Sequence, residues 1–222
     1  FGPETFIHFD GQGISGVSCG DCAEVAAMGG PFDGALWALA HDGALLRGDG
    51  TSFETALASD ATEGMGALLD LWAGEDGVWI AGTSMLSSEG PFSVSLRRWD
   101  GASLETIIDC ESAAFDSSRV YLWGAGDTVF LVGSSGLALR IEGSSVEQLD
   151  VGTEEDLVDV SGVDENDVWA AGSEGTVFHF DGASWSAVEV AGLGDRYVHA
   201  VHAAPTGEVF LAASARWWLD EP

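Results

Sequence analysis

One motif recurs five times along the chain and constrains its fold more than any other feature. A basic residue, any residue, an acidic residue and glycine are followed, three positions later, by an apolar side chain. The copies begin at His8, Arg47, Arg98, Arg140 and His179. Repeats of roughly 40 residues indicate one supersecondary unit stacked several times, since a single unit cannot bury its own apolar face.

Each motif is preceded by two further β-rich segments. The nearer one starts with an apolar–aromatic pair, at Leu36-Trp37, Val78-Trp79, Val129-Phe130, Val168-Trp169 and Val209-Phe210. The farther one is a short apolar run. The acidic residue and glycine form a turn in which glycine takes a positive φ and the carboxylate accepts backbone N–H bonds. Each unit therefore predicts four antiparallel strands, named A to D here.

These units predict an all-β fold, a single five-bladed β-propeller over residues 1–222. The expected blades are about 23–58, 66–108, 118–150 and 156–190, and the fifth joins 197–222 to 1–18. The first motif has no strands A and B before it, and the last A–B pair has no motif after it. We therefore expect the two ends to complete one blade and to meet in a B–C hairpin from Ala215 to Glu4, which removes exposed sheet edges.

The run DVWAAGSEGTVFHFDGASW, from Asp167 to Trp185, carries a resemblance to known proteins. It resembles the propeller repeats of large secreted bacterial proteins, which are loosely grouped with Kelch, Asp-box and YVTN-type propellers. The similarity extends to all five units and is clearest in the fourth. It implies the propeller fold and says little about function, because propellers have many functions.

The charge of the chain excludes several partners. It has 37 acidic and 7 basic residues in 222, and a formal net charge of −30. This charge argues against nucleic acid or an anionic membrane as a partner. No apolar run is long enough to span a bilayer. The seven residues counted as basic are all arginine and none is lysine, which indicates a GC-rich bacterial source, and the acidity indicates a salty or marine setting or serves solubility. We expect a monomer outside the cytoplasm.

The cysteine spacing has three interpretations. Cys19 and Cys22 are separated by two residues, as in a redox motif, half a zinc site or a small local disulfide. No second pair of this spacing and no nearby histidine follow, which disfavours zinc. We favour a local disulfide, typical of an exported protein, with Cys110 left reduced.

Two sets of polar residues are candidates for metal binding or catalysis. The acidic turn at Asp164, Glu165 and Asp167 offers oxygen ligands for Ca²⁺, although a solvated acidic turn is the favoured explanation. No other cofactor is expected. One polar residue also recurs within the apolar A strands, which line the channel of a propeller: Glu24, Asp70, Tyr121, Asp159 and His199. Converging carboxylates would raise a pKa and serve a metal or an acid–base pair, or the channel holds only water.

The loops predict a groove on the face that carries the B–C and D–A connections, called the top face. Long B–C hairpins on blades two and five flank a short turn on blade one. The expected lining is His41, Asp42, Met85, Phe92, Trp217 and Trp218. Exposed aromatic rings beside polar groups suit a sugar or a peptide, although the two tryptophans also fit a role as a cover for the blade.

Three function classes follow from these features. The first is a non-catalytic extracytoplasmic module that binds carbohydrate or protein through its top-face loops. The second is a carbohydrate-active enzyme, a glycosidase or lyase, with Glu24, Asp70, Asp159 and His199 as catalytic groups. The third is a structural propeller unit of a larger protein. We favour the first, because no hydrolase, nucleotide-binding or metalloprotease motif occurs in the sequence.

Overall fold

The computed structural model describes residues 5–9, 12, 14–18, 24–32, 35–49, 51–85, 91–109 and 115–215. Regular structure in these residues is β-strand apart from short 3₁₀ turns. The turns are η1 (Ser59–Thr62), η3 (Ser134–Gly136) and η4 (Ser173–Gly175). No described helix is long and apolar enough to cross a membrane. Cys19, Cys22 and Cys110, and with them the predicted disulfide, lie outside the described residues.

Four antiparallel sheets of four strands form the body of the molecule, and we call them blades one to four. Blade one contains β3 (Val25–Phe32), β4 (Ala35–Ala40), β5 (Leu45–Gly48) and β6 (Phe53–Leu57). Blade two contains β7 (Ala67–Gly74), β8 (Gly77–Met85), β9 (Phe92–Trp99) and β10 (Leu104–Ile108). Blade three contains β11 (Val120–Ala125), β12 (Thr128–Gly133), β13 (Ala138–Glu142) and β14 (Ser145–Gln148). Blade four contains β15 (Leu157–Asp164), β16 (Asp167–Gly172), β17 (Val177–Phe180) and β18 (Trp185–Ala187).

Two shorter sheets flank the four blades. One pairs β1 (Thr5–Phe9) with β2 (Ile14–Ser18), and the other pairs β19 (Tyr197–Ala203) with β20 (Val209–Ser214). The all-β fold with four-stranded antiparallel sheets is confirmed. A fifth four-stranded blade is not confirmed, because its expected strands form these two separate pairs. The predicted meeting of the termini involves residues 1–4 and 216–222, which lie outside the described residues.

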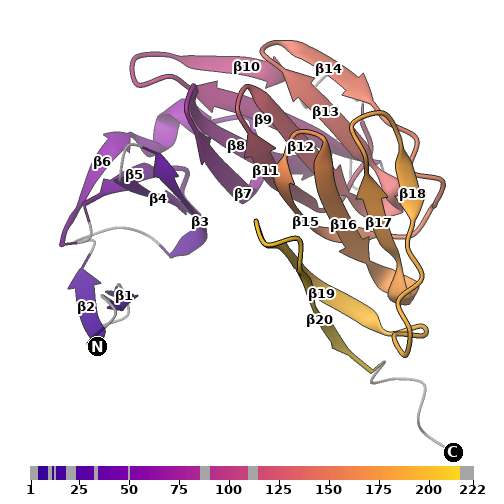
Figure 1. Ribbon diagram of the computed structural model, residues 1–222. Coiled ribbons are helices and arrows are strands. Elements are labelled where there is room, and N and C mark those ends of the chain that lie inside the picture. The colour runs from indigo at the N-terminus through magenta and orange to yellow at the C-terminus, as the bar shows by residue number, and fades with distance from the viewer. Residues whose placement is uncertain are drawn as a thin grey trace, which may run out of the picture.

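The sheets stand side by side in a curved row (Figure 1). Consecutive inner strands are neighbours: β3 lies beside β7, β7 beside β11, β11 beside β15, and β15 beside β19. The pair β1–β2 lies at one end of this row and β19–β20 at the other (Figure 1).

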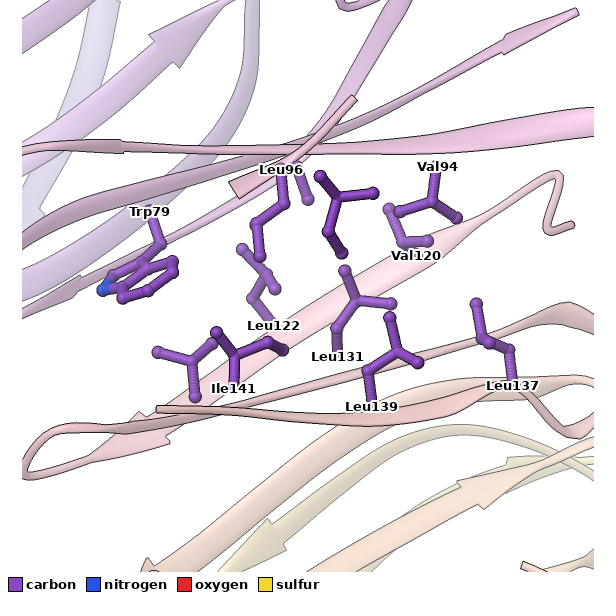
Figure 2. Packing of buried hydrophobic residues seen from close by; sticks show 12 residues of the cluster. Trp79, Val94, Leu96, Val120, Leu122, Leu131, Leu137, Leu139 and Ile141 are labelled. Atoms are coloured by element: carbon purple, nitrogen blue, oxygen red, sulfur yellow. The ribbon is translucent and has the colours of Figure 1, made fainter. Parts of the chain in front are cut away.

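Burial explains the sequence pattern of the strands. The second strand of blades two and three is buried on both faces because a neighbouring blade packs against each side; all six residues of β12 are buried. The outermost strands, such as β14, are mostly exposed. Figure 2 shows the cluster between blades two and three, where Trp79 and Leu96 face Leu122, Leu131 and Ile141. Each interface of this kind forms a separate small core.

The recurrent aromatic residue of strand B is buried between blades in three of the blades. Trp37, Trp79 and Phe130 are buried between blades, and Trp169 is half-buried against β19–β20. At the fifth such position, Phe210 is instead 57% exposed. Phe210 lies on β20, which pairs only with β19 among the strands that the structure describes.

The acidic residues of the C–D turns have the structural role that the sequence indicates. One oxygen of Asp100 accepts the backbone N–H groups of Ala102 and Ser103, and Asp181 repeats the pattern two blades later. These backbone bonds lower the pKa of both carboxyls. Gly182 follows with φ of 91°. The recurrent acidic–glycine pair therefore holds turns together.

Candidate functional site

A groove opens between blades one and two on the top face. Its volume is about 620 Å³. The B–C turn of blade one contributes His41 and Asp42, the crossover between the blades contributes Asp60 and Glu63, and blade two contributes Leu68 and Ser84. The sequence placed His41 and Asp42 in a groove here, and the structure brings them together with two further carboxylates.

The two sides of the groove are tied directly to each other. The Thr62 hydroxyl, at the end of η1, lies 3.2 Å from the carbonyl oxygen of Gly43 and 3.1 Å from that of Ser59. Gly43 has a φ of 98°, and a Cβ there would lie 1.9 Å from the Thr62 hydroxyl oxygen. Only glycine fits this turn without moving the opposite wall.

Arg97 holds the crossover from the blade-two side. Its guanidinium donates to the carbonyl oxygens of Ala61, at 2.8 Å, and Glu63, at 3.1 Å. Because the carbonyls at the end of η1 are thus satisfied, the wall is fixed without a ligand. Sequence reasoning missed Arg97, Asp60 and Glu63, because the crossover carries no repeated motif that would have aligned it with the loops of the other blades.

Other predicted lining residues are more remote or not described. Ser84 lines the groove, but Met85, one residue further along β8, does not and is 51% exposed. Phe92 lies opposite Met85 in the β8–β9 pair and is half-buried. Trp217 and Trp218 lie outside the described residues. Most of the residues that line the described groove are therefore polar, and three of them are acidic.

β-Bulges in the inner strands explain why the sequence alone aligned only some of the polar channel residues correctly. A β-bulge adds one residue to β3, β7, β15 and β19. The residue after each bulge, and Tyr121 in the regular strand β11, occupy equivalent positions; in sequence order these are Ala27, Asp70, Tyr121, Asp159 and Ala200.

The alignment of Glu24 and His199 with this set is wrong. Glu24 is exposed before β3. His199 is the extra residue of its bulge. Its Nε2 lies 2.7 Å from the Ser214 hydroxyl, and its ring centre lies 4.9 Å from that of Tyr197, with the two rings tilted.

Asp70 and Asp159 join neighbouring blades. One oxygen of Asp70 accepts the N–H of Leu71 on its own strand, at 2.9 Å, and the other accepts that of Leu122 on the next blade, at 2.8 Å. Asp159 does the same with Val160 and with Val201 on β19. Each carboxylate therefore bonds two inner strands at once.

Burial raises the pKa of both carboxyl groups. It raises the pKa of Asp70 to about 6, and it outweighs the two backbone N–H bonds that favour the charged form. Burial likewise raises the pKa of Asp159, against its backbone bonds and the nearby charge of His202. A carboxyl with a pKa near neutrality has the property of a general acid, and equally that of a buried structural group.

Asp164 and Asp167, in the acidic turn of blade four, accept different structural hydrogen bonds. Asp164 accepts the backbone N–H of Asn166. Asp167 accepts the Trp169 indole N–H at 3.0 Å and lies 2.8 Å from His179 Nε2, and the His179 ring stacks on Trp169. Among the described residues no group of three or more histidine, cysteine or acidic side chains is placed to hold a metal ion. A Ca²⁺ site that includes Glu165 stays a prediction.

The same arrangement explains the basic residue of the repeated motif. In blade two, Arg98 lies over the Trp79 ring at 5.5 Å and pairs with Asp76 at 3.0 Å, while the Trp79 indole donates to Asp76. A basic residue on strand C, an aromatic residue on strand B and an acid in the A–B turn therefore form one packed unit. The motif marks blade packing on the face opposite the groove.

Comparison with known proteins supports the fold. No protein-family profile and no curated protein matches the sequence. Solved structures do match. The chain has a β-propeller-like fold.

Three of the matching structures illustrate the likeness. YCF48 bound to D1 peptide is 16% identical, with a TM-score of 0.67 over 96% of this chain and 70% of that one. YCF48 from Cyanidioschyzon merolae is 14% identical, with a TM-score of 0.68 over 96% and 72%. The extracellular domain of the hybrid two-component system BT4673 from B. thetaiotaomicron is 12% identical, with a TM-score of 0.59 over 86% and 26%. At these identities the likeness concerns the fold alone, and the Kelch, Asp-box or YVTN grouping is not confirmed.

Proposed function

We propose that the protein is a non-catalytic recognition module that binds a segment of a partner protein in the groove over blades one and two. The observation that carries this proposal is the groove itself, about 620 Å³ in volume and lined by Asp42, Asp60, Glu63 and His41. Its walls are held by Thr62 and Arg97. A preformed site loses little conformational entropy on binding.

The negative charge of the groove indicates which kind of peptide segment would bind there. Three carboxylates lie in the lining of a protein whose net charge is −30, so a basic segment is attracted both locally and at long range. A peptide is favoured over a glycan because the described lining has no tryptophan, tyrosine or phenylalanine ring for a sugar to stack on. One structural neighbour, YCF48, was solved with a D1 peptide bound, which supports a peptide as ligand.

We place this activity outside the cytoplasm. The structural neighbours include extracellular domains of B. thetaiotaomicron sensor proteins. A monomeric, secreted or periplasmic binder fits the many surface carboxylates, which keep copies of the chain apart.

A carbohydrate-active enzyme is the second candidate, and one observation favours it. Burial raises the pKa of Asp70 to about 6, as a general acid requires. However, both oxygens of Asp70 accept backbone N–H bonds. Asp70→Asn should abolish glycosidase or lyase activity if the channel is catalytic, and it should leave peptide binding unchanged if the groove is the site.

A binding experiment tests the proposed function. The probes are a fluorescent, end-blocked peptide of alternating arginine and alanine, its glutamate counterpart, and cellohexaose as a neutral glycan. We expect the basic peptide alone to bind. The variant Asp42→Asn/Asp60→Asn/Glu63→Gln should weaken it by roughly tenfold, about 1.4 kcal/mol.

A matched control separates the groove from general attraction. Glu147→Gln/Glu154→Gln/Glu189→Gln removes the same charge from exposed positions elsewhere. This variant should bind like the unaltered protein. Equal losses in both variants would mean that the peptide senses only the overall charge, and binding of cellohexaose instead would replace the peptide by a glycan.

A further inference from the structure

A second, smaller pocket lies on the face opposite the groove, and we call it the lower pocket. It is lined by the A–B and C–D turns of blade two and by the strand-B tryptophan of blade one, and its volume is about 120 Å³. The lining contains two tryptophans and three carboxylates: Trp37, Trp99, Glu75, Asp76 and Asp100. Unlike the groove, this pocket combines indole rings with negative charge.

Trp37 brings a hydrogen-bond donor without an acceptor to this pocket. The residue is 6% exposed, and its indole Nε1 is buried and has no partner among the described residues. In blade two the equivalent indole, that of Trp79, donates to Asp76 at 3.2 Å, and blade four has the same kind of bond. The A–B turn of blade one, at 33–34, lies outside the described residues. Because buried donors are nearly always satisfied, the Trp37 N–H indicates an acceptor that the described residues do not supply.

The lower pocket keeps a negative charge. Asp76 is neutralised by Arg98, which lies 3.0 Å from it and also pairs with Glu105. The backbone N–H groups and the serine hydroxyl of its own turn bond Asp100, which lowers its pKa and keeps it charged. Glu75 is exposed, and neither it nor Asp100 forms a salt bridge with a described residue. A cation in the pocket therefore meets two carboxylates that no arginine neutralises.

The size and the walls of the pocket narrow the class of cation. A volume of 120 Å³ is that of about four water molecules in the liquid, so it admits a head group of a few heavy atoms and not a peptide segment or an oligosaccharide. Within the described part of the chain, no group of three histidine, cysteine or acidic side chains is placed to hold a metal ion. Indole rings attract organic cations, and quaternary ammonium groups above all, through the negative charge of their faces.

We propose that the lower pocket binds a small quaternary ammonium compound of the size of choline. Its methyl groups lie against the Trp99 ring, its positive charge is balanced by Glu75 and Asp100, and its oxygen accepts the Trp37 N–H. A neutral molecule would gain nothing from the carboxylates, and a cation without an oxygen would leave the indole unpaired. This site is separate from the groove, which lies on the opposite face and takes a different ligand.

A titration followed by the NMR signals of the indole N–H groups tests the ligand. The probes are choline, its neutral carbon analogue, in which a tert-butyl group replaces the trimethylammonium, and tetramethylammonium, which has the charge without the oxygen. Choline should shift the signal of Trp37, identified by its loss in Trp37→Phe, and should bind roughly tenfold more tightly than the neutral analogue. Equal binding of these two, or a Trp37 signal that does not move, overturns the proposal.

Variants divide the contributions of charge and hydrogen bond. Glu75→Gln should weaken choline about fivefold, as one charge pair in water allows. The matched control is Asp127→Asn, which removes an exposed carboxylate from the A–B turn of blade three on the same face and should leave binding unchanged. Trp37→Phe keeps a ring without the N–H, so it should abolish the preference for choline over tetramethylammonium while tetramethylammonium binds as before.

Two further outcomes would contradict the assignment. Equal losses in Glu75→Gln and Asp127→Asn would mean that the cation senses only the overall charge of the protein. Tighter binding of an end-blocked trimethyllysine than of choline would replace the free compound by a modified side chain of another protein. Either result overturns the proposal.

Discussion

At the scale of single residues, the buried carboxylates Asp70 and Asp159 connect the sequence to the architecture. Each places its two oxygens on two backbone N–H groups, one from its own strand and one from the next blade. Removing such a carboxylate leaves an inner-strand N–H without its partner, which costs about 1–3 kcal/mol. A carboxylate rather than an amide is needed there, because an amide offers only one acceptor oxygen.

The protonation of Asp70 should therefore be visible in solution. Its folded pKa, about 6, lies above the ordinary value of 3.8, so the folded state binds the proton more tightly. The contribution to stability is complete below pH 4 and is lost as the pH rises through 6. We expect the NMR signal of the Asp70 carboxyl carbon to titrate near pH 6.

The difference in unfolding free energy between wild type and Asp70→Asn should also shrink between pH 4 and pH 7. Asp49 provides the contrast, because hydrogen bonds from Thr51 and Ser52 lower its pKa to about 2. An Asp70 midpoint below pH 4 would show that the group is well solvated.

At the scale of elements, the short turns and crossovers decide the shape of the top face. The B–C turns of blades three and four contain Ser135 and Glu174 with φ of 57° and 54°, in the region that favours glycine. The backbone N–H of Ser135 is bonded to the Asp156 side chain across the blade boundary. These turns therefore accept backbone strain while they tie one blade to the next.

Relief of that strain gives a prediction. A non-glycine residue in this conformation destabilises the folded state by about 1–2 kcal/mol. Glycine avoids this strain but lowers the stability by about 0.5–1 kcal/mol, because it loses more conformational entropy on folding. Ser135→Gly should therefore raise the free energy of unfolding by about 0.5 kcal/mol, measured with urea. Gly136→Ala should do the opposite, because its Cβ would lie 2.0 Å from the Thr153 carbonyl oxygen. Destabilisation by Ser135→Gly would show that its side chain supports the turn.

The groove wall gives a second prediction at this scale. Arg97→Gln removes the donors to Ala61 and Glu63, so hydrogen exchange in residues 59–66 should become faster. The basic peptide should then bind about fivefold more weakly, because the site is no longer preformed. Arg47→Gln changes the charge equally at a distance from the groove and should leave both measurements unchanged. Weaker binding without faster exchange would contradict a positioning role for Arg97.

The sequence predicted the strands and their order because β-period and turn signals repeat in every unit. It predicted only part of the site. His41 and Asp42 follow from loop length, whereas Asp60 and Glu63 reach the groove through a crossover without a repeated pattern. The channel residues were misaligned because a β-bulge adds one residue without any mark in the sequence, as at His199. The local pattern of β20 matches that of the buried B strands, so it does not report that Phe210 is exposed in a sheet of only two strands.

At the scale of the whole molecule, repulsion among the many negative charges destabilises the folded state. The 37 acidic residues face only 7 arginines, and several of these arginines are already paired within blades, such as Arg98 with Asp76 and Glu105. The remaining carboxylates repel one another across the surface, and this repulsion weakens as salt shortens the Debye length.

Salt should therefore stabilise the protein. Raising NaCl from 0.05 to 0.5 M should increase Tm by several degrees, measured by circular dichroism, while binding of the basic peptide weakens over the same range. These opposite responses share one cause, the screening of the same carboxylates. A Tm that stays constant or falls with salt would show that repulsion contributes little to the folded state.

The carboxylate links also define how such a chain can change in length. Asp70 joins blade two to three and Asp159 joins blade four to β19–β20, while Tyr121 takes the equivalent place in blade three. A blade that supplies an acceptor carboxylate thus alternates with a blade that supplies the N–H donor for it. Copying one blade within the gene would set two carboxylate blades, or two blades without a carboxylate, side by side and leave a link unmade. The unit that duplication or deletion can use without loss is a pair of blades, about twice the length of the repeat in the sequence.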